Sequence, residues 1–262
     1  MKDIINDLIA EQSQVDTLVA GLTEEQWLTP MPGCAPWTIK DAIIHIAFFD
    51  YAANVLMNSD KYEDLVQLSD AESGQDEDYV CHNFTHLSGA EVLLWWREER
   101  TKLDFAFMNK NPKDRIPWAP GLPMSAKSLC SARLMELWAH SVDIYDALGV
   151  DVSVDSKRIQ SVLFLSWQSR PFAYRINGAE LPETPMYLEL KLPNGDIWAK
   201  GEPDAENRIT GDASDWALVS VRRRNWMDTG LDVKGDEARR YAAFVQCYAG
   251  GADSAPEAKN PR

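Results

Sequence analysis

The sequence predicts an α+β protein in which a bundle of four long helices is followed by a smaller α+β unit. Apolar residues recur at helical spacing through most of residues 1–150, and after Val150 the pattern changes to short alternating runs. Two of these runs are joined by Asn194-Gly195, a pair that favours a two-residue hairpin turn. With 262 residues, 45% of them hydrophobic, the chain is long enough to bury a substantial core.

The first two long helices follow from apolar periodicity and from residues that favour helix ends. The stripe from Asp3 to Ala20 predicts a helix that stops at Gly21. Thr23 and Gln26 have the spacing of a capping box for a short helical turn, after which the segment PMPGCAP is predicted to be a loop. The second long helix is predicted from Thr38 to about Met57.

An acidic, aperiodic stretch from Ser59 to Tyr79 separates these helices from the next two and is predicted to be a long solvated connection. Ser88 and Glu91 form the capping box of the third helix. The Pro-rich segment NPKDRIPWAPGLP is predicted to be a loop leading to a fourth helix from about Ser125, its cap, to Leu148. Gly149 then occupies the position that a C-cap glycine prefers. All four helices need partners for their apolar stripes, so residues 1–150 are predicted to form a bundle.

Residues 151–250 are predicted to form the second unit, and residues 251–262 a disordered tail because they lack apolar content. The alternating runs FAYRI, MYLELKL and DIWAK are predicted to be strands, the last two paired through the turn at Asn194-Gly195. The other elements predicted here are helices at Asp155–Trp167, Asp212–Arg224 and Asp236–Tyr248, with a short strand at Leu231–Val233.

Composition excludes several classes of partner and site. There are 41 acidic and 26 basic residues, a net charge of -15, and such a field repels nucleic acid and anionic membranes. The basic cluster Arg222–Arg224 is too small to overcome it. No stretch reaches the roughly 20 apolar residues of a membrane helix, and the N-terminus lacks the features of a leader, so a cytoplasmic protein is expected. The four cysteines contain no CxxC pair, which argues against a thiolate zinc cluster and a disulfide framework.

One polar run on the fourth helix carries the expected chemistry. Arg133, Glu136, His140 and Asp143 follow one another at steps of three and four, so they share a helix face. Apolar residues continue this face at both ends, which turns it toward the interior. A buried Glu without a partner costs several kcal/mol, roughly, and a metal ion shared with a histidine is one way to satisfy it. A structural Glu136–His140 link is the simpler alternative.

His45 on the second helix is the third predicted ligand, because its apolar neighbours on the same face aim it at the same interior. Two imidazoles and one carboxylate suit zinc, our first choice, and also nickel or iron, and they leave positions open for water or substrate. Asp143 is expected to hold the second ring nitrogen of His140 as an outer partner. His82 and His86 form a rival pair at the same spacing, but they precede the third helix and are predicted to be surface residues.

Two segments resemble a known family. WTIKDAIIHIAFFD (37–50) and ARLMELWAHSVDIYDALGV (132–150) resemble the metal-binding motifs of the DinB-like bundle in mycothiol-dependent maleylpyruvate isomerases. That superfamily places a His on its second helix and a Glu-x3-His pair on a later one, which match His45, Glu136 and His140. Segments such as RPFAYRINGAE and FVQCYAG extend the likeness to an uncharacterised maleylpyruvate isomerase-like subfamily, whose C-terminal domain is similar to sterol carrier protein folds.

The resemblance implies a function as well as a fold. It implies one divalent metal that activates a low-molecular-weight thiol, such as mycothiol or glutathione, or water, against a carboxylate-bearing small molecule. The chemistry expected is that of an isomerase or S-transferase. Two alternatives stay open: a non-catalytic small-molecule binding protein with a structural metal, and a non-haem Fe(II) oxygenase. Neither the oligomeric state nor the substrate follows from the sequence.

Arginines are expected to bind the carboxylate of a substrate or thiol, because a guanidinium can donate two parallel hydrogen bonds to it. Arg97 and Arg100 on the third helix are candidates, although an exposed helix face paired with neighbouring glutamates explains them equally well. Arg222 and Arg223 are the candidates from the second unit. Trp118, in the loop before the fourth helix, is expected to form a wall of the pocket above the ligands.

Overall fold

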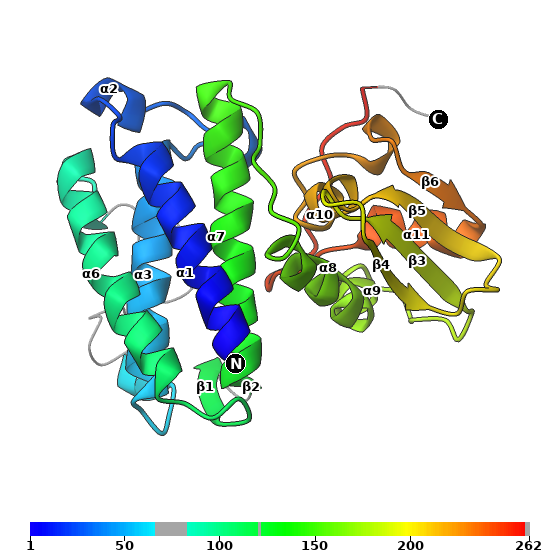
Figure 1. The fold of residues 1–262 in the computed structure, drawn as a ribbon, viewed down its shortest axis with the longest axis horizontal. Helices are drawn as coiled ribbons and strands as arrows, with labels where there is room; N and C mark the ends of the chain where they lie inside the picture. The colour runs from blue at the N-terminus through cyan, green and yellow to red at the C-terminus, as the bar shows by residue number, and fades with distance from the viewer. Residues whose placement is uncertain (66–82, 120–121, 260–262) are drawn as a thin grey trace. The chain divides into compact units, whose positions relative to one another are not determined.

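The computed structural model describes residues 1–65, 83–119 and 122–259. The chain divides into two compact units, Met1–Val152 and Ser153–Arg262. Helices dominate the first unit and a mixed sheet with helices makes up the second, so the predicted α+β class is confirmed (Figure 1). Within the described ranges no helix combines the length and the apolar character needed to cross a membrane.

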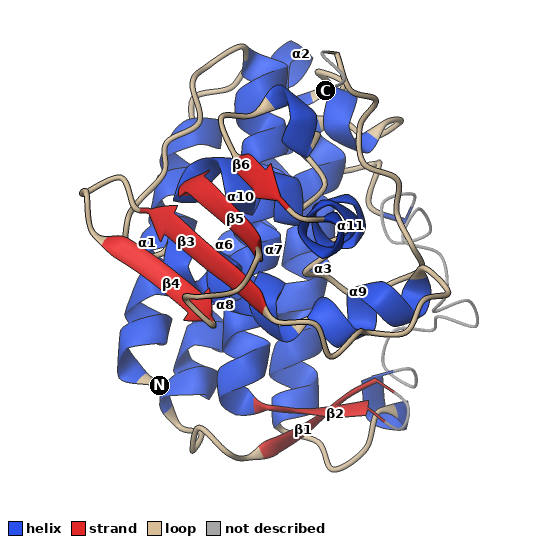
Figure 2. Ribbon diagram, turned by 90° about the vertical axis from the view of Figure 1, so that its right-hand side faces the viewer, coloured by secondary structure: helices blue, strands red, loops and turns tan. Residues whose placement is uncertain are grey.

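Four long helices build the first unit: α1 (Lys2–Val19), α3 (Ile39–Met57), α6 (Gly89–Met108) and α7 (Ala126–Leu148). Helix α3 packs against α6 and α7, and α1 packs against the same two helices (Figures 1 and 2). Their apolar faces share one core, whose large buried side chains include those of Trp27, Trp96 and Phe107. All four helices lie within a few residues of their predicted positions. The packing of α3 against α7 is the contact that the candidate site requires.

Local sequence fixes where these helices begin and end. The predicted capping box at Ser88 is present, and Thr38, the predicted start of α3, forms another. In each box the hydroxyl accepts from the backbone N–H three residues later, and the carboxylate there accepts in return. The same reciprocal pair opens the short helix α2 (Glu24–Trp27) at Thr23. Ser125 caps α7, and Gly149 ends it in the left-handed region at φ 65°.

The predicted loop before α7 is wrong, because the chain forms a hairpin there. Strand β1 (Arg115–Ala119) pairs antiparallel with β2 (Leu122–Ser125), with Arg115 opposite Ser125. Each strand contains a proline, which has no backbone N–H to donate to the hydrogen bonds between strands. A proline therefore argues against a strand inside a larger sheet. In a sheet of two strands both members are edges, so prolines are tolerated where their missing N–H faces away from the partner.

The second unit contains a four-stranded sheet in the order β4-β3-β5-β6 (Figure 2). The predicted hairpin joins β3 (Met186–Lys191) to β4 (Ile197–Gly201), and β6 (Asp232–Lys234) lies at the predicted short strand. Sequence reasoning missed β5 (Asn207–Asp212), which pairs parallel with β3. The helices of this unit are α8 (Ile159–Gln168), α9 (Arg170–Ile176), α10 (Ala213–Ser220) and α11 (Asp236–Phe244), together with a short 3-10 helix, η2 (Trp226–Asp228). A second short 3-10 helix, η1 (Pro32–Cys34), belongs to the first unit.

The segment FAYRI is helical, within α9, and not a strand as predicted. Pro171 occupies the first turn, where proline favours a helix start, and the consecutive residues Ala173 and Tyr174 are both buried. A half-buried strand would bury alternate residues instead. Alternation over five residues is too short a pattern to separate the two structures.

Residues 251–259 carry no helix or strand, yet they form hydrogen bonds, which differs from the expected disordered tail. The backbone N–H of Asp253 donates to Gln246 Oε1 at 3.0 Å, and that of Lys259 donates to Asp228 Oδ2 at 2.9 Å. These contacts hold backbone groups through polar side chains of the same unit. A low apolar content therefore does not prevent the segment from being held.

Stability is expected to fall as the pH rises from about 4 to about 7, because of Asp104 on α6. Burial raises the pKa of Asp104 to about 7, with a smaller contribution from the charge of Asp50, and the hydrogen bond from Gln12 Nε2 only partly opposes it. The folded state therefore keeps a proton that the unfolded state releases above its pKa near 4. Urea unfolding midpoints across this range should fall in the wild type and vary less in Asp104→Asn. Equal slopes in the two proteins would contradict the prediction.

Candidate metal centre

The first unit brings together the three side chains that the sequence singles out. His45 lies on α3, and Glu136 and His140 lie one turn apart on α7. One donor atom from each lies within 4.8 Å of the others, and the two imidazole centroids are 5.0 Å apart. Both histidines are buried whereas Glu136 is half-buried, so the set opens on its carboxylate side. Donors around a bound zinc ion are roughly 3–4 Å apart, which small side-chain rotations would achieve.

Aromatic rings surround the two imidazoles. The Trp37 ring centroid lies 5.0 Å from that of His45 and 5.8 Å from that of His140, and the Phe49 centroid lies 4.7 Å from that of His45. The ring centroids of Phe49 and of Trp118, on β1, are 6.1 Å apart, so Trp118 extends this group of rings, which we call the aromatic wall. Sequence reasoning gave no role to Trp37, although its place just before the Thr38 cap puts it at the same end of α3 as His45. The rings restrict access of water to the histidines.

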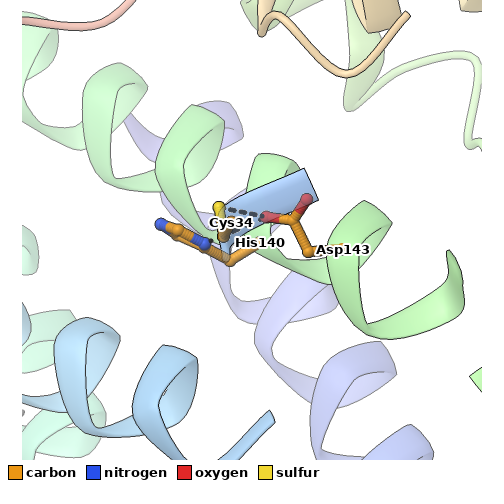
Figure 3. Close-up of side chains that lie close together, drawn as sticks. All are labelled: Cys34, His140 and Asp143. Carbon is orange, nitrogen blue, oxygen red and sulfur yellow. Dashed lines mark hydrogen bonds and ion pairs between the residues drawn. The ribbon is translucent and has the colours of Figure 1, made fainter. Parts of the chain in front are cut away.

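Asp143, the predicted outer partner, lies beside His140. Its Oδ2 lies 3.2 Å from Nδ1 of His140, and it also accepts a hydrogen bond from Cys34 Sγ at 3.2 Å (Figure 3). Nδ1 nevertheless makes no hydrogen bond of ordinary geometry among the described residues. Cys34 ends η1 and was not predicted to approach the site. No spacing rule could have found it, since it reaches α7 only through the packing of a loop.

The fourth member of the polar run, Arg133, is paired with Asp50 of α3 inside the core. Arg133 Nε donates to Asp50 Oδ1 at 3.0 Å, and Trp96 Nε1 donates to Asp50 Oδ2 at 3.1 Å. Burial raises the pKa of Asp50, and the charge of Arg133 together with these hydrogen bonds opposes that shift. The guanidinium also lies 5.9 Å from the Phe49 ring, so this ion pair packs directly behind the aromatic wall.

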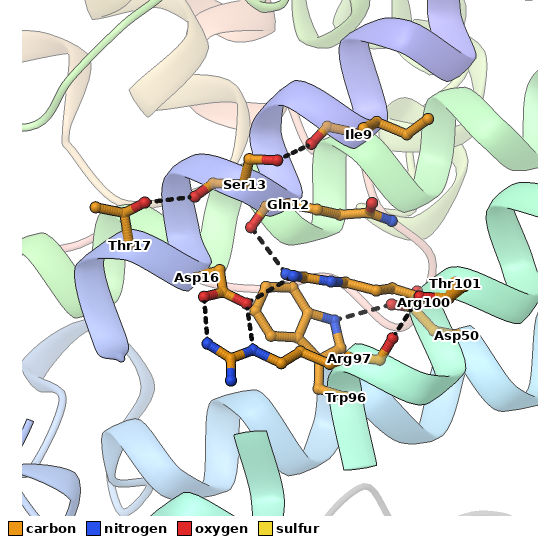
Figure 4. A network of polar contacts seen from close by, with 10 residues as sticks. All are labelled: Ile9, Gln12, Ser13, Asp16, Thr17, Asp50, Trp96, Arg97, Arg100 and Thr101. Carbon is orange, nitrogen blue, oxygen red and sulfur yellow. Dashed lines mark hydrogen bonds and ion pairs between the residues drawn. The ribbon is translucent and has the colours of Figure 1, made fainter. Parts of the chain in front are cut away.

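Arg97 and Arg100, proposed from sequence as substrate ligands, bind Asp16 of α1 (Figure 4). Arg97 donates to both oxygens of Asp16, at 2.8 and 2.7 Å, and Arg100 Nη2 donates to the same carboxylate at 2.6 Å. Arg100 also donates to the Gln12 carbonyl and lies 4.5 Å from the Trp96 ring centroid. Their hydrogen bonds connect α6 to α1, and neither uses the neighbouring glutamates that the sequence suggested as partners.

Arg100→Ala is expected to destabilise the first unit more than Arg97→Ala does. The Arg100 side chain is 18% exposed and that of Arg97 is 41% exposed, so solvent screens the Arg97 pair more strongly. We expect a loss of about 1–3 kcal/mol for Arg100, a charged hydrogen-bonding group, and below about 1 kcal/mol for Arg97. Denaturant unfolding of the two variants measures the difference. A larger loss for Arg97 would contradict this ranking.

Comparisons with known proteins identify the family. The sequence model described as the mycothiol maleylpyruvate isomerase N-terminal domain matches residues 8–145, more than half of the chain. The chain belongs to the mycothiol maleylpyruvate isomerase family. The uncharacterized proteins MT0041 and Rv0036c, from two strains of Mycobacterium tuberculosis, are each 34% identical to it over 248 residues, which is 94% of this chain and 95% of each relative.

Solved structures agree with the fold of this family. The crystal structure of the mycothiol-dependent maleylpyruvate isomerase matches 85% of this chain and 89% of its own, with a TM-score of 0.59 and 15% identity. A mutant of that enzyme matches over the same shares with a TM-score of 0.59 and 14% identity. At this identity the likeness shows the fold alone.

Within the family match lie all three predicted metal ligands, together with Asp143. Arg222 and Arg223 lie outside it, in the second unit, where their guanidinium groups bind backbone carbonyls. Arg222 donates to Ala243 and Phe244, Arg223 donates to Val221, and burial lowers the pKa of Arg222. His86 is exposed before α6, as predicted for a surface residue, whereas His82 lies outside the described residues.

Proposed function

We propose that this protein is a metal-dependent enzyme that uses a small thiol, as an isomerase or S-transferase acting on a carboxylate-bearing small molecule. The observation that carries the proposal is the cluster of His45, Glu136 and His140 within 4.8 Å, inside the region that the family model matches. The name of the family adds mycothiol as the first thiol to test, with glutathione second. Zinc is the proposed metal, with nickel and iron as alternatives.

The chemistry of the donor set supports an open site. His45, Glu136 and His140 would hold the ion, and three protein ligands leave a position for a thiol or water. When bound, a divalent metal lowers the pKa of a coordinated thiol and so supplies the nucleophilic thiolate. Asp143 lies 3.2 Å from Nδ1 of His140 and would hold the proton there after a small rotation of the ring, and Trp37 and Phe49 would limit access of water.

For an isomerisation, a thiolate held at this site would supply reversible C–S bond formation at a substrate double bond, which would permit rotation about that bond and return the thiol at the end. No oxidant or reductant would be consumed. In S-transfer the C–S bond would be retained instead, and the leaving group would depart from the substrate.

We propose further that the four long helices form a DinB-like bundle and that the second unit is of the sterol carrier type. Support comes from the packing of α1, α3, α6 and α7 and from the mixed sheet flanked by helices. Arg222 and Arg223 would contribute to substrate binding only if they exchanged their present carbonyl partners.

The decisive experiment is thiol binding to the cobalt-loaded protein. Cys34→Ala is used as background, so that Cys34, which lies beside the site, cannot give a thiolate-to-cobalt charge-transfer band in place of added mycothiol or glutathione. We expect the band with one thiol, its loss in Cys34→Ala/Glu136→Gln, and isomerisation of maleylpyruvate or a related substrate by the zinc form. A protein that binds metal but neither thiol would contradict the proposal and favour a binding protein with a structural metal.

A further inference from the structure

We infer that Cys34, Asp143 and His140 form a second set of metal donors, which competes with the first set for His140 and takes a thiophilic cation. Cys34 Sγ and His140 Nδ1 each lie 3.2 Å from Asp143 Oδ2, and one donor atom from each residue lies within 4.8 Å of the others (Figure 3). Nothing in the proposed function requires this set, because its thiol belongs to the chain.

The distances fit a small ion. Around a tetrahedral zinc ion, a nitrogen or sulfur donor lies roughly 3.3–3.6 Å from a carboxylate oxygen, from the Zn–N, Zn–O and Zn–S bond lengths. The two 3.2 Å separations are close to these values, so Cys34 Sγ and His140 Nδ1 already lie at nearly the distances from Asp143 Oδ2 that a bound zinc ion would require. A cation in the middle would replace the thiol proton in the contact between Cys34 and Asp143.

His140 gives an independent indication of a ligand. The residue is 7% exposed, and its Nδ1 is buried with no aligned hydrogen bond among the described residues. A buried ring nitrogen of this kind is costly unless an N–H finds an acceptor or a lone pair finds a cation. Asp143 is fully buried beside it, so a positive charge there would also compensate the carboxylate.

The two donor sets compete because the second set takes Nδ1 of His140 and leaves only the other ring nitrogen for the first set. Nδ1 faces Asp143, and the other ring nitrogen points away from Cys34 and Asp143 in Figure 3. A neutral imidazole has one nitrogen with a free lone pair, and the other nitrogen carries the proton. The tautomer of His140 therefore decides which set is complete. A soft ion favours the set that contains sulfur, and harder ions favour the set that contains Glu136.

Cadmium tests the inference directly, because thiolate ligation produces an ultraviolet charge-transfer band. All proteins carry Cys81→Ala, which removes the thiol outside the described residues. We expect the band and one cadmium ion per chain in this background, loss of the band in Cys34→Ala, and its retention in Glu136→Gln. Cys130→Ala is the matched control, since Cys130 is buried in α7. The cadmium band of this variant should persist unchanged.

The outcomes separate this inference from the proposed function. A band that is absent in the background protein, survives Cys34→Ala, or accompanies two ions per chain overturns the second set or its competition with the first. Failure of added thiols to bind cobalt in Cys34→Ala leaves these readings unchanged, because that test concerns the first set alone. Circular dichroism of each apo variant shows that the fold is intact before titration.

Discussion

Glu136→Gln is expected to weaken metal binding by more than about 100-fold, because changes to outer partners alone cost about 10–100-fold and Glu136 is a proposed direct ligand. The substitution keeps the shape of the side chain but removes its charge and replaces one acceptor oxygen by an NH2 donor. An amide oxygen is a much poorer donor to zinc than a carboxylate is. Competition with a chromogenic chelator, using zinc and nickel in turn, measures the change in affinity.

A matched control is available on α6, where Glu98 is exposed and its charge is not part of either donor set. Glu98→Gln makes the same change in net charge and should retain wild-type metal affinity. Because Glu136 is half-buried and has no role in the apolar core, the apo form of Glu136→Gln should unfold at the wild-type midpoint. Equal affinities in the two variants would remove Glu136 from the site and leave the structural link to His140 as its role.

Asp50→Ala is expected to lower the free energy of unfolding by about 3–5 kcal/mol, the usual cost of leaving one partner of a buried ion pair alone. The Arg133 guanidinium is 2% exposed, and its remaining hydrogen bond to protein is the one to the Ile46 carbonyl at 3.3 Å, counting bonds within the described residues. Trp96 would also lose its acceptor. Urea unfolding followed by tryptophan fluorescence measures the change.

The double variant Asp50→Leu/Arg133→Met is the control, because it replaces both charges by apolar groups of similar volume. Removing both partners of a buried pair is often close to neutral, so we expect it to be more stable than Asp50→Ala. The difference gives the cost of an unpaired buried guanidinium. If Asp50→Ala lost less than the double variant, solvent would have to reach Arg133 and the pair would not be part of the closed core.

The structure shows which parts of the site follow from spacing and which do not. Glu136 and His140 share a face because a helix repeats every 3.6 residues, and this relation holds wherever α7 packs. The approach of His45 depends on α3 lying beside α7, which the apolar stripes of both helices made predictable. Cys34 and Trp37 reach the site from the loop before α3, and the sequence carries no periodic signal for them.

The partners of charged residues were least predictable. Arg100 could have paired with neighbouring glutamates on its own helix, but its hydrogen bonds go to Asp16 and Gln12 on α1. Arg133 lies in the same polar run as His140 and yet pairs with Asp50. A long side chain reaches several candidate partners, and the choice among them depends on which helices pack together and on how much water remains between them.

The sequence by itself determined the long helices, their caps, the hairpin at Asn194-Gly195 and the helix face that carries Glu136 and His140. These features depend on interactions between residues near one another in the chain, which obey fixed periods and fixed turn geometries. Tertiary structure alone decided the β1–β2 hairpin, the parallel β3–β5 pairing, and the place of Cys34 beside Asp143. Each of these joins segments whose own sequence permits several conformations, so packing selects among them.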